Sequence, residues 1–276
     1  MDDHAIRRRI PKCIAALTLA ASVALGGGVS AAEQTATEPE KPKTAATEDG
    51  RRTVHRLPAN LGRGIVGVFH RDTLVPLVIG GVATGGAWVL DEEMRDWINP
   101  DPGEGWGQTL ETAGGAVWSG VFVGSLFTAG RISKNARFRA ASYDMLDAAV
   151  MNAVYFQSIK LVAKRTRPNG ENNQSFPSGH TSNAFALATV AERHYGWKIG
   201  VPAYLLAGAV GASRMKQDMH YFSDVVAGAT LGYIVGRTVV RVNSRPLADG
   251  SRKGASFNMA PIVARHARGM QMSLTF

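Results

Sequence analysis

The sequence has one cysteine, Cys13, among its 276 residues. A chain with a single thiol forms no internal disulfide, so a disulfide-stapled extracellular scaffold is excluded and the fold must be held by packing alone. The sequence also lacks basic residues alternating with stacking aromatic residues, and it contains no nucleic-acid-binding motif. Nucleic acid is therefore not an expected partner.

Acidic residues are fewer than basic ones: 22 Asp and Glu stand against 31 Lys and Arg, for a formal net charge of +9. A positive excess of this kind attracts anions. Since nucleic acid is not expected, anionic small molecules or lipid headgroups are the better candidates. We expect an anionic phosphate ester or lipid phosphate as the ligand, with membrane contact; the sequence does not predict an oligomeric state.

The N-terminus has the organisation of a secretory signal. Three arginines in MDDHAIRRRIPK precede the apolar run CIAALTLAASVALGGGV and the small residues SAA, so residues 1–32 are predicted to be a signal peptide cleaved after Ala31 or Ala32. An uncleaved membrane anchor is the alternative, although the apolar run is short for a membrane span. Residues 33–54, rich in Thr, Ala, Glu, Lys and Pro, are predicted to be a disordered tether.

Long apolar segments rich in Ala, Gly, Leu and Val follow the tether, and their length favours helices over strands. We predict an all-α bundle over residues 55–245. Its six core segments are 73–90, 113–130, 143–163, 180–193, 199–212 and 224–241.

The tail, residues 246–276, has a different pattern. Met270, Met272, Leu274 and Phe276 alternate along MQMSLTF, and ASFNMAPIVA could pair with this stretch across an Arg268-Gly269 turn. We predict a small terminal β-hairpin that covers the bundle. One hairpin cannot close an outer-membrane barrel, so the terminal Phe is not read as a barrel signal.

Two groups of polar residues border the apolar segments. In KLVAKRTRP, Lys160 and Arg167 are seven residues apart, which predicts two cations on one helix face and a helix end at Pro168. In FPSGH, Ser178, Gly179 and His180 stand at a predicted helix entrance, where unpaired N–H groups and the helix dipole attract anions. Each pattern alone also fits an ordinary helix end.

The third group is SRMKQDMHYFSD, which contains Arg214, His220 and Asp224. His220 and Asp224 are four residues apart, about one helical turn, so the carboxylate can hold one ring nitrogen and activate the other. Arg214 offers a planar fork for two phosphate oxygens. Alone, a His-x3-Asp pair is also typical of an exposed helix surface.

Together, the three groups resemble the signature of the type 2 phosphatidic acid phosphatase and vanadium haloperoxidase superfamily. Eleven positions match, in order: Lys160, Arg167, Pro168, Pro177, Ser178, Gly179, His180, Ser213, Arg214, His220 and Asp224. The resemblance implies His220 as a phosphohistidine-forming nucleophile, Asp224 as its orienting carboxylate, and His180 as the acid and then the base. It implies phosphate binding by Lys160, Arg167, Ser178, Gly179 and Arg214, without a metal or other cofactor.

A metal-independent phosphatase acting on a phosphomonoester or a lipid (pyro)phosphate is therefore expected, with a bell-shaped pH profile in the acidic to neutral range. The alternatives are a vanadate-dependent haloperoxidase and a non-catalytic lipid- or phosphate-binding membrane protein. A metal site at His180, His220, Asp218 and Asp224 is disfavoured, because the neighbouring cations would repel a metal ion.

The sequence allows two predictions of the cellular location. We favour an exported periplasmic protein, soluble or lying against a membrane, over an integral inner-membrane protein of six helices with a periplasmic active site. Basic links after segments two and six and the acidic link 91–104 fit the second topology under the positive-inside rule. The signal peptide conflicts with that topology, and segments four and five are short for a bilayer.

Overall fold

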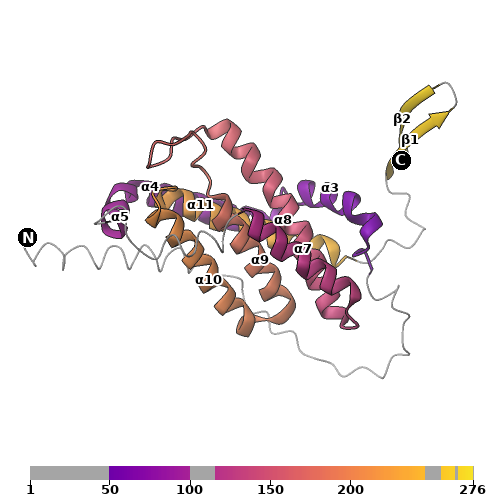
Figure 1. Cartoon of the computed structure of the whole chain (residues 1–276), viewed down its shortest axis with the longest axis horizontal. Coiled ribbons are helices and arrows are strands. Elements are labelled where there is room, and N and C mark those ends of the chain that lie inside the picture. Colours follow the sequence, from indigo (N-terminus) through magenta and orange to yellow (C-terminus); the bar gives the residue numbers. More distant parts are fainter. Residues whose placement is uncertain (1–49, 100–115, 246–255, 265–266, 276) are drawn as a thin grey trace, which may run out of the picture. The chain divides into compact units, whose positions relative to one another are not determined.

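The computed structural model describes residues 50–99, 116–245, 256–264 and 267–275. The predicted all-α bundle is confirmed: all six expected segments are helices (Figure 1). They are α4 (Leu74–Val89), α7 (Ala116–Ile132), α8 (Ala136–Ala163), α9 (Gly179–Tyr195), α10 (Trp197–Lys216) and α11 (Phe222–Asn243). Two shorter helices were not predicted, α3 (Leu57–Gly67) and α5 (Asp91–Ile98), and single 3-10 turns cover Val54–Arg56 and Arg71–Thr73.

Helix α11 is the central helix of the bundle and packs against α9, α4, α8 and α3. Its closest neighbour is α9, and three glycines on α11 make that approach possible. A Cβ atom at Gly228, Gly232 or Gly236 would meet the backbone oxygens of Ser178, Ser182 or Ala186 at 2.6, 2.1 and 2.6 Å. The missing side chains therefore let the two backbones touch, which fixes the start of α9 against the start of α11.

The core that supports this pair is made of small and medium apolar side chains. Ala148 and Met151 of α8, Val190 of α9 and Val235 of α11 are fully buried and belong to one cluster. A second cluster, around Met94 of α5 and Met215 of α10, also includes Phe222, the first residue of α11. Both ends of residues 213–224, which carry the third motif, are therefore packed into the apolar core.

Two helices within the described residues are long and apolar enough to cross a membrane, Arg71–Val89 and Phe222–Asn243. They differ in burial, because 61% of the second window lies inside the protein against 17% of the first. Helix α11 is therefore the core helix of the bundle. Helix α4 instead presents an apolar surface, on which Val75, Val78 and Val82 are 66, 63 and 73% exposed.

The predicted helix end at Pro168 is wrong. Helix α8 ends at Ala163, and the next residue, Lys164, adopts a left-handed conformation with φ 46° while its N–H group donates to the Lys160 carbonyl. This C-cap turns the chain out of the helix five residues before Pro168. Arg167 therefore belongs to the following loop, and the two cations meet through a turn rather than along one helix face.

The predicted tether boundary at residue 54 is also too late. The signal peptide and most of the tether lie outside the described residues, but Arg52 already contacts the bundle. Its guanidinium lies 2.8 Å from the carboxylate of Asp144, which also accepts from Asn243 and contacts His194. A buried carboxylate attracts a guanidinium strongly, so a segment that is polar by composition is nevertheless anchored.

The C-terminal residues form a separate unit that contains a β-hairpin. Strands β1 (Ser256–Ala264) and β2 (Ala267–Thr275) pair antiparallel, and the pair nearest the turn is Ala264 with Ala267. The turn predicted at Arg268-Gly269 is wrong, because these residues lie within β2 opposite Val263 and Ile262. Alternation alone predicts a hairpin but leaves its register open.

Candidate active site

The three motifs meet where α9 and α11 begin. The Ser178 amide donates to the Asp224 carbonyl at 3.0 Å, which joins the second motif to the third. The Asn169 amide donates to the Asp218 carbonyl, also at 3.0 Å, and ties the loop after α8 to the same place. Residues from three distant parts of the chain thus converge on one site.

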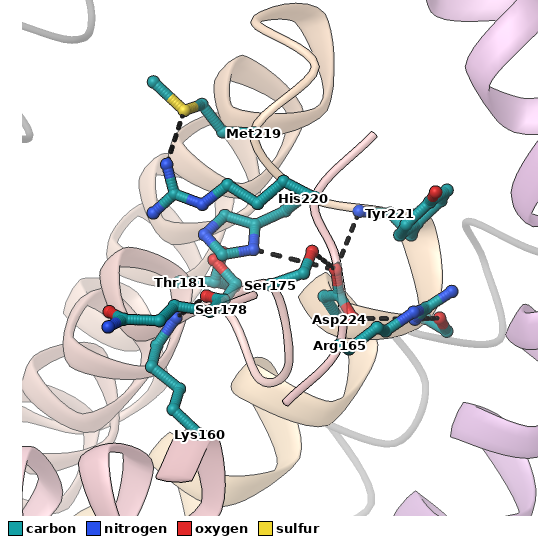
Figure 2. A network of polar contacts seen from close by, with 12 residues as sticks. Lys160, Arg165, Ser175, Ser178, Thr181, Met219, His220, Tyr221 and Asp224 are labelled. Atoms are coloured by element: carbon teal, nitrogen blue, oxygen red, sulfur yellow. Dashed lines mark hydrogen bonds and ion pairs between the residues drawn. The ribbon is translucent and has the colours of Figure 1, made fainter. Parts of the chain in front are cut away.

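His220 faces Asp224 across the first turn of α11. The Nδ1 atom of His220 lies 3.7 Å from Asp224 Oδ2, and the two side chains are 3 and 0% exposed (Figure 2). This separation is longer than a hydrogen bond, but the orientation leaves Nε2 as the ring nitrogen directed away from the carboxylate. Asp224 also accepts from the Tyr221 amide at 2.9 Å and from the Ser175 hydroxyl, which fixes the carboxylate.

Three cations predicted to bind phosphate lie in or beside this site. Lys160 and Arg214 are 8 and 3% exposed, and the Lys160 ammonium donates to the Gln174 carbonyl. Arg167 contacts Glu171 at 3.1 Å and the Met219 sulfur at 2.9 Å, and its buried Nε has no hydrogen-bond partner among the described residues. A partly buried guanidinium with a spare donor is suited to binding an oxyanion.

The start of α9 has the predicted form of an anion-binding entrance. Ser178 is the residue before the helix, but its hydroxyl pairs with Thr181 Oγ1 at 2.8 Å and does not cap a backbone amide. At Gly179 a Cβ atom would lie 3.1 Å from the Phe156 ring, so a side chain there would crowd the entrance. The first amides of α9 therefore remain available beside the cations.

The charges of these groups also affect the protonation of His180. Burial, as the largest cause, and then the charges of Arg214, His220, Lys160 and Arg167 together lower the pKa of His180 to about 4. Burial likewise lowers the pKa of His220 and brings the pKa of Lys160 down to about 8. At neutral pH both imidazoles are therefore uncharged, which suits a nucleophile, while Lys160 stays largely protonated.

The expectation that His180 carries a proton does not fit its low pKa in this arrangement. Several positive charges disfavour the imidazolium form. A phosphate dianion among the same cations would offset them and favour it. The acid role implied by the family resemblance thus depends on an anion at the site.

Sequence reasoning missed three residues that contact the Asp224 carboxylate or its neighbour. Arg165 donates to Asp224 Oδ1 at 2.7 Å, Ser175 donates to Oδ2, and Asp91 of α5 pairs with Arg165 at 2.7 Å. Arg165 lies in the KLVAKRTRP stretch. Because α8 ends at Ala163, its spacing from Lys160 does not indicate a shared helix face. Asp91 lies in the link 91–104, whose only feature in the sequence was its acidic composition, so no pattern pointed to a role at the site.

The four residues of the disfavoured metal-site alternative do not form a metal-binding cluster in the described structure. Asp218 pairs with Arg95, with its Oδ1 atom 2.9 Å from Arg95 Nε. No group of three or more His, Cys, Asp or Glu side chains suited to a metal occurs in the part of the chain that the structure describes. The residues that surround His180 and His220 are suited to an anion.

Comparison with known proteins agrees with the motifs. Residues 145–246 match the model of the PAP2 superfamily, a span that contains all three motifs. The resemblance that the motifs predicted is thereby confirmed for residues 145–246, which are similar to the type 2 phosphatidic acid phosphatase superfamily.

Two curated relatives are similar to short parts of the chain. A "Lipid A 1-phosphatase" of Porphyromonas gingivalis is 43% identical over 75 residues, which are 26% of this chain and 17% of that protein. A "Probable diacylglycerol pyrophosphate phosphatase 1" of Schizosaccharomyces pombe is 33% identical over 88 residues, 27% of this chain and 32% of that protein. The chain thus spans less than a third of each relative.

Two solved structures are similar to the chain at lower identity. The crystal structure of Aquifex aeolicus LpxE is 23% identical with a TM-score of 0.47, over 55% of this chain and 95% of that one. The crystal structure of the first transmembrane PAP2 type phosphatidylglycerolphosphate phosphatase from Bacillus subtilis is 17% identical with a TM-score of 0.39, over 84% of this chain and 93% of that one.

Proposed function

We propose that this protein is a metal-independent phosphatase that hydrolyses a lipid phosphate monoester or lipid pyrophosphate through a phosphohistidine on His220. The observation that carries the proposal is the convergence of Lys160, Arg167 and Arg214 with the entrance of α9 around a carboxylate-braced imidazole. Phosphoryl transfer spreads charge over three oxygens and requires mainly positioning and fixed positive potential. Three cations and a helix N-terminus supply both.

In the first step, Asp224 holds the Nδ1–H tautomer of His220, so the lone pair of Nε2 attacks phosphorus. The bond from phosphorus to the leaving oxygen breaks, and His180 donates its proton to that oxygen. In the second step, His180 takes a proton from water, whose oxygen attacks the phosphohistidine. The bond between nitrogen and phosphorus breaks, inorganic phosphate leaves and His220 is restored.

A lipid substrate is favoured over a soluble ester by the surface of α4. Leu74, Val75, Leu77, Val78 and Val82 are each more than half exposed, a face too apolar for ordinary solvent contact. The named activities of the two curated relatives, a lipid A phosphatase and a probable diacylglycerol pyrophosphate phosphatase, agree with this class. A lipid surface against α4 would bring such a substrate to the protein.

The test is release of inorganic phosphate from a panel of lipid phosphates in mixed vesicles and from soluble aryl phosphates, with and without chelator. We expect turnover in chelator, higher kcat/KM on vesicle lipids, and loss of turnover in His220→Ala by about 10³-fold or more. Activity that requires a divalent metal, or that survives in His220→Ala, would refute the proposal. Bromination that requires vanadate would instead support the haloperoxidase alternative.

We also propose a periplasmic location, from the N-terminal sequence pattern and the apolar α4 surface together. Fractionation with a carbonate wash and N-terminal sequencing of the mature protein tests it. Recovery in the envelope with an N-terminus near residue 32 is expected. Recovery from the cytosol with Met1 retained would contradict it.

A further inference from the structure

A chain of polar contacts extends from the catalytic carboxylate to helix α5, and the phosphatase mechanism above does not use it. The guanidinium of Arg165 lies between two carboxylates. Its Nη1 donates to Asp224 Oδ1 at 2.7 Å, and its Nη2 donates to Asp91 Oδ2 at 2.7 Å (Figure 2 shows the Asp224 side). Both acids are nearly inaccessible, since their side chains are 0 and 6% exposed.

Ser223 closes the arrangement on the side of α11. Its hydroxyl accepts from Arg165 Nη1 at 2.7 Å and donates to Asp91 Oδ2 at 2.7 Å, while its amide donates to Asp91 Oδ1 at 2.8 Å. Asp91 is therefore fixed by the first turn of the same helix that carries Asp224. Helix α5, α11 and the loop after α8 are held together at this one point.

Two aromatic rings cover the faces of the Arg165 guanidinium. Its central carbon lies 3.9 Å from the centre of the Trp88 ring and 4.1 Å from that of Tyr221. A planar guanidinium suits such a site, because it stacks on rings while its edge donates to two carboxylates. A lysine could replace the charge but not the fork.

The two oxygens of Asp224 are consequently divided between different tasks. Oδ1 faces Arg165, whereas Oδ2 accepts from Ser175 and Tyr221 and faces His220 Nδ1. Because both terminal nitrogens of Arg165 already donate to this network, Arg165 is poorly placed to bind the substrate phosphate. Its contacts instead fix the rotation of the carboxylate that orients the nucleophile.

We propose that Arg165 and Asp91 are positioning residues, which lock the Asp224 carboxylate so that Oδ2 holds the Nδ1–H tautomer of His220. This inference rests on the proposed function. Without Arg165, two buried carboxylates would share a site with no cation between them, and one would take up a proton. A protonated or rotated Asp224 would no longer hold His220 as a nucleophile.

The test compares wild type with Arg165→Lys and Arg165→Gln on a soluble aryl phosphate, and follows the His220 ring by ¹⁵N NMR of histidine-labelled protein. We expect kcat to fall about 10- to 100-fold in Arg165→Lys, with KM changed less than about threefold. Arg165→Gln should lower kcat further and move the acidic limb of the kcat profile to higher pH. In both variants the ¹⁵N chemical shifts of the His220 ring should no longer be those of the Nδ1–H tautomer.

Arg241→Lys is the matched control, because Arg241 pairs with Asp72 at 2.8 Å from the last turn of α11, outside the catalytic contacts. It should keep kcat and the His220 shifts. Asp91→Asn, nearly isosteric, is the second variant should the Arg165 variants not fold, and it should lower kcat with KM preserved.

The outcomes separate the inference from the function it rests on. A wild type that releases no phosphate from any substrate overturns the proposed function, and the tautomer of His220 in the variants still decides the positioning role. An active wild type with unchanged kcat and unchanged His220 shifts in Arg165→Lys overturns the inference. A rise in KM alone also overturns it, because it would make Arg165 a substrate ligand.

Discussion

At the scale of single residues, the site depends on how charge is distributed around two imidazoles. His220 has a carboxylate within 3.7 Å, whereas the charges facing His180 are those of Arg214, Lys160 and Arg167. A neighbouring carboxylate stabilises a proton on the first ring, and neighbouring cations repel one from the second. The two histidines are thereby set for different tasks, although His220 is buried and His180 is partly buried.

This difference predicts a pH dependence that changes when substrate binds. The free enzyme holds His180 with a pKa of about 4, so the protonated acid is lost as pH rises above that value and kcat/KM falls. A bound phosphate dianion offsets the cations and raises the pKa of His180, so the alkaline limb of kcat should lie at higher pH than that of kcat/KM. Steady-state profiles of both constants check this.

His180→Gln serves as the control for that profile. Because the variant has no titrating group at this position, its residual activity on the same substrate should lack the alkaline limb. Limbs that coincide in kcat and kcat/KM would show that the dianion does not change the protonation of His180.

At the scale of elements, the decisive contact is the one between α9 and α11. The α9 entrance and the His220–Asp224 turn can face one anion only if the two helices approach closely. Gly228, Gly232 and Gly236 provide that approach at intervals of one turn. The small residues in GATLGYIVG therefore bring the second and third motifs together through backbone spacing.

Gly232→Ala tests this spacing. Its Cβ would lie 2.1 Å from the Ser182 carbonyl oxygen, so the helices must separate, and we expect a loss of about 1–3 kcal/mol in the free energy of unfolding together with a fall in kcat. Thermal unfolding and phosphate release measure the two effects.

Gly208→Ala on α10 is the matched control, since no other described part of the chain lies within 4 Å of its new Cβ. It should be neutral or stabilise by up to about 1 kcal/mol, as alanine favours a helix. Equal unfolding midpoints for the two variants would contradict the role given to Gly232.

At the scale of the whole molecule, the sequence predicted the bundle because long apolar segments have few alternatives to helices. It also predicted that the three motifs meet, because they occur in a fixed order, while the catalytic and phosphate-binding roles of their residues stay predictions. It could not predict Asp91, which reaches the site only through the packing of α5 on α11. Nor could it predict that Arg167 lies in a loop. The left-handed residue that ends α8 is Lys164, whereas such a helix end is predicted from a glycine.

The tether boundary and the position of the hairpin turn could not be predicted for a related reason, although the hairpin itself is present. Arg52 is anchored by Asp144, a carboxylate 92 residues away, and composition carries no information about such a partner. In the tail, alternation indicated strands, but the register of β1 with β2 depends on pairing that a single strand does not encode. Local patterns predicted elements well and long-range contacts poorly.

The central claim is that three distant motifs form one anion site with His220 as the attacking group. The most direct test is to quench the reaction with a labelled phosphate ester in alkali, which preserves phosphohistidine, and to find the modified peptide by mass spectrometry. We predict phosphate on His220 in the wild type, with chelator present, and more of it when His180→Gln slows the second step. A phosphate group on any other residue, or turnover without a phosphoenzyme, would contradict the account.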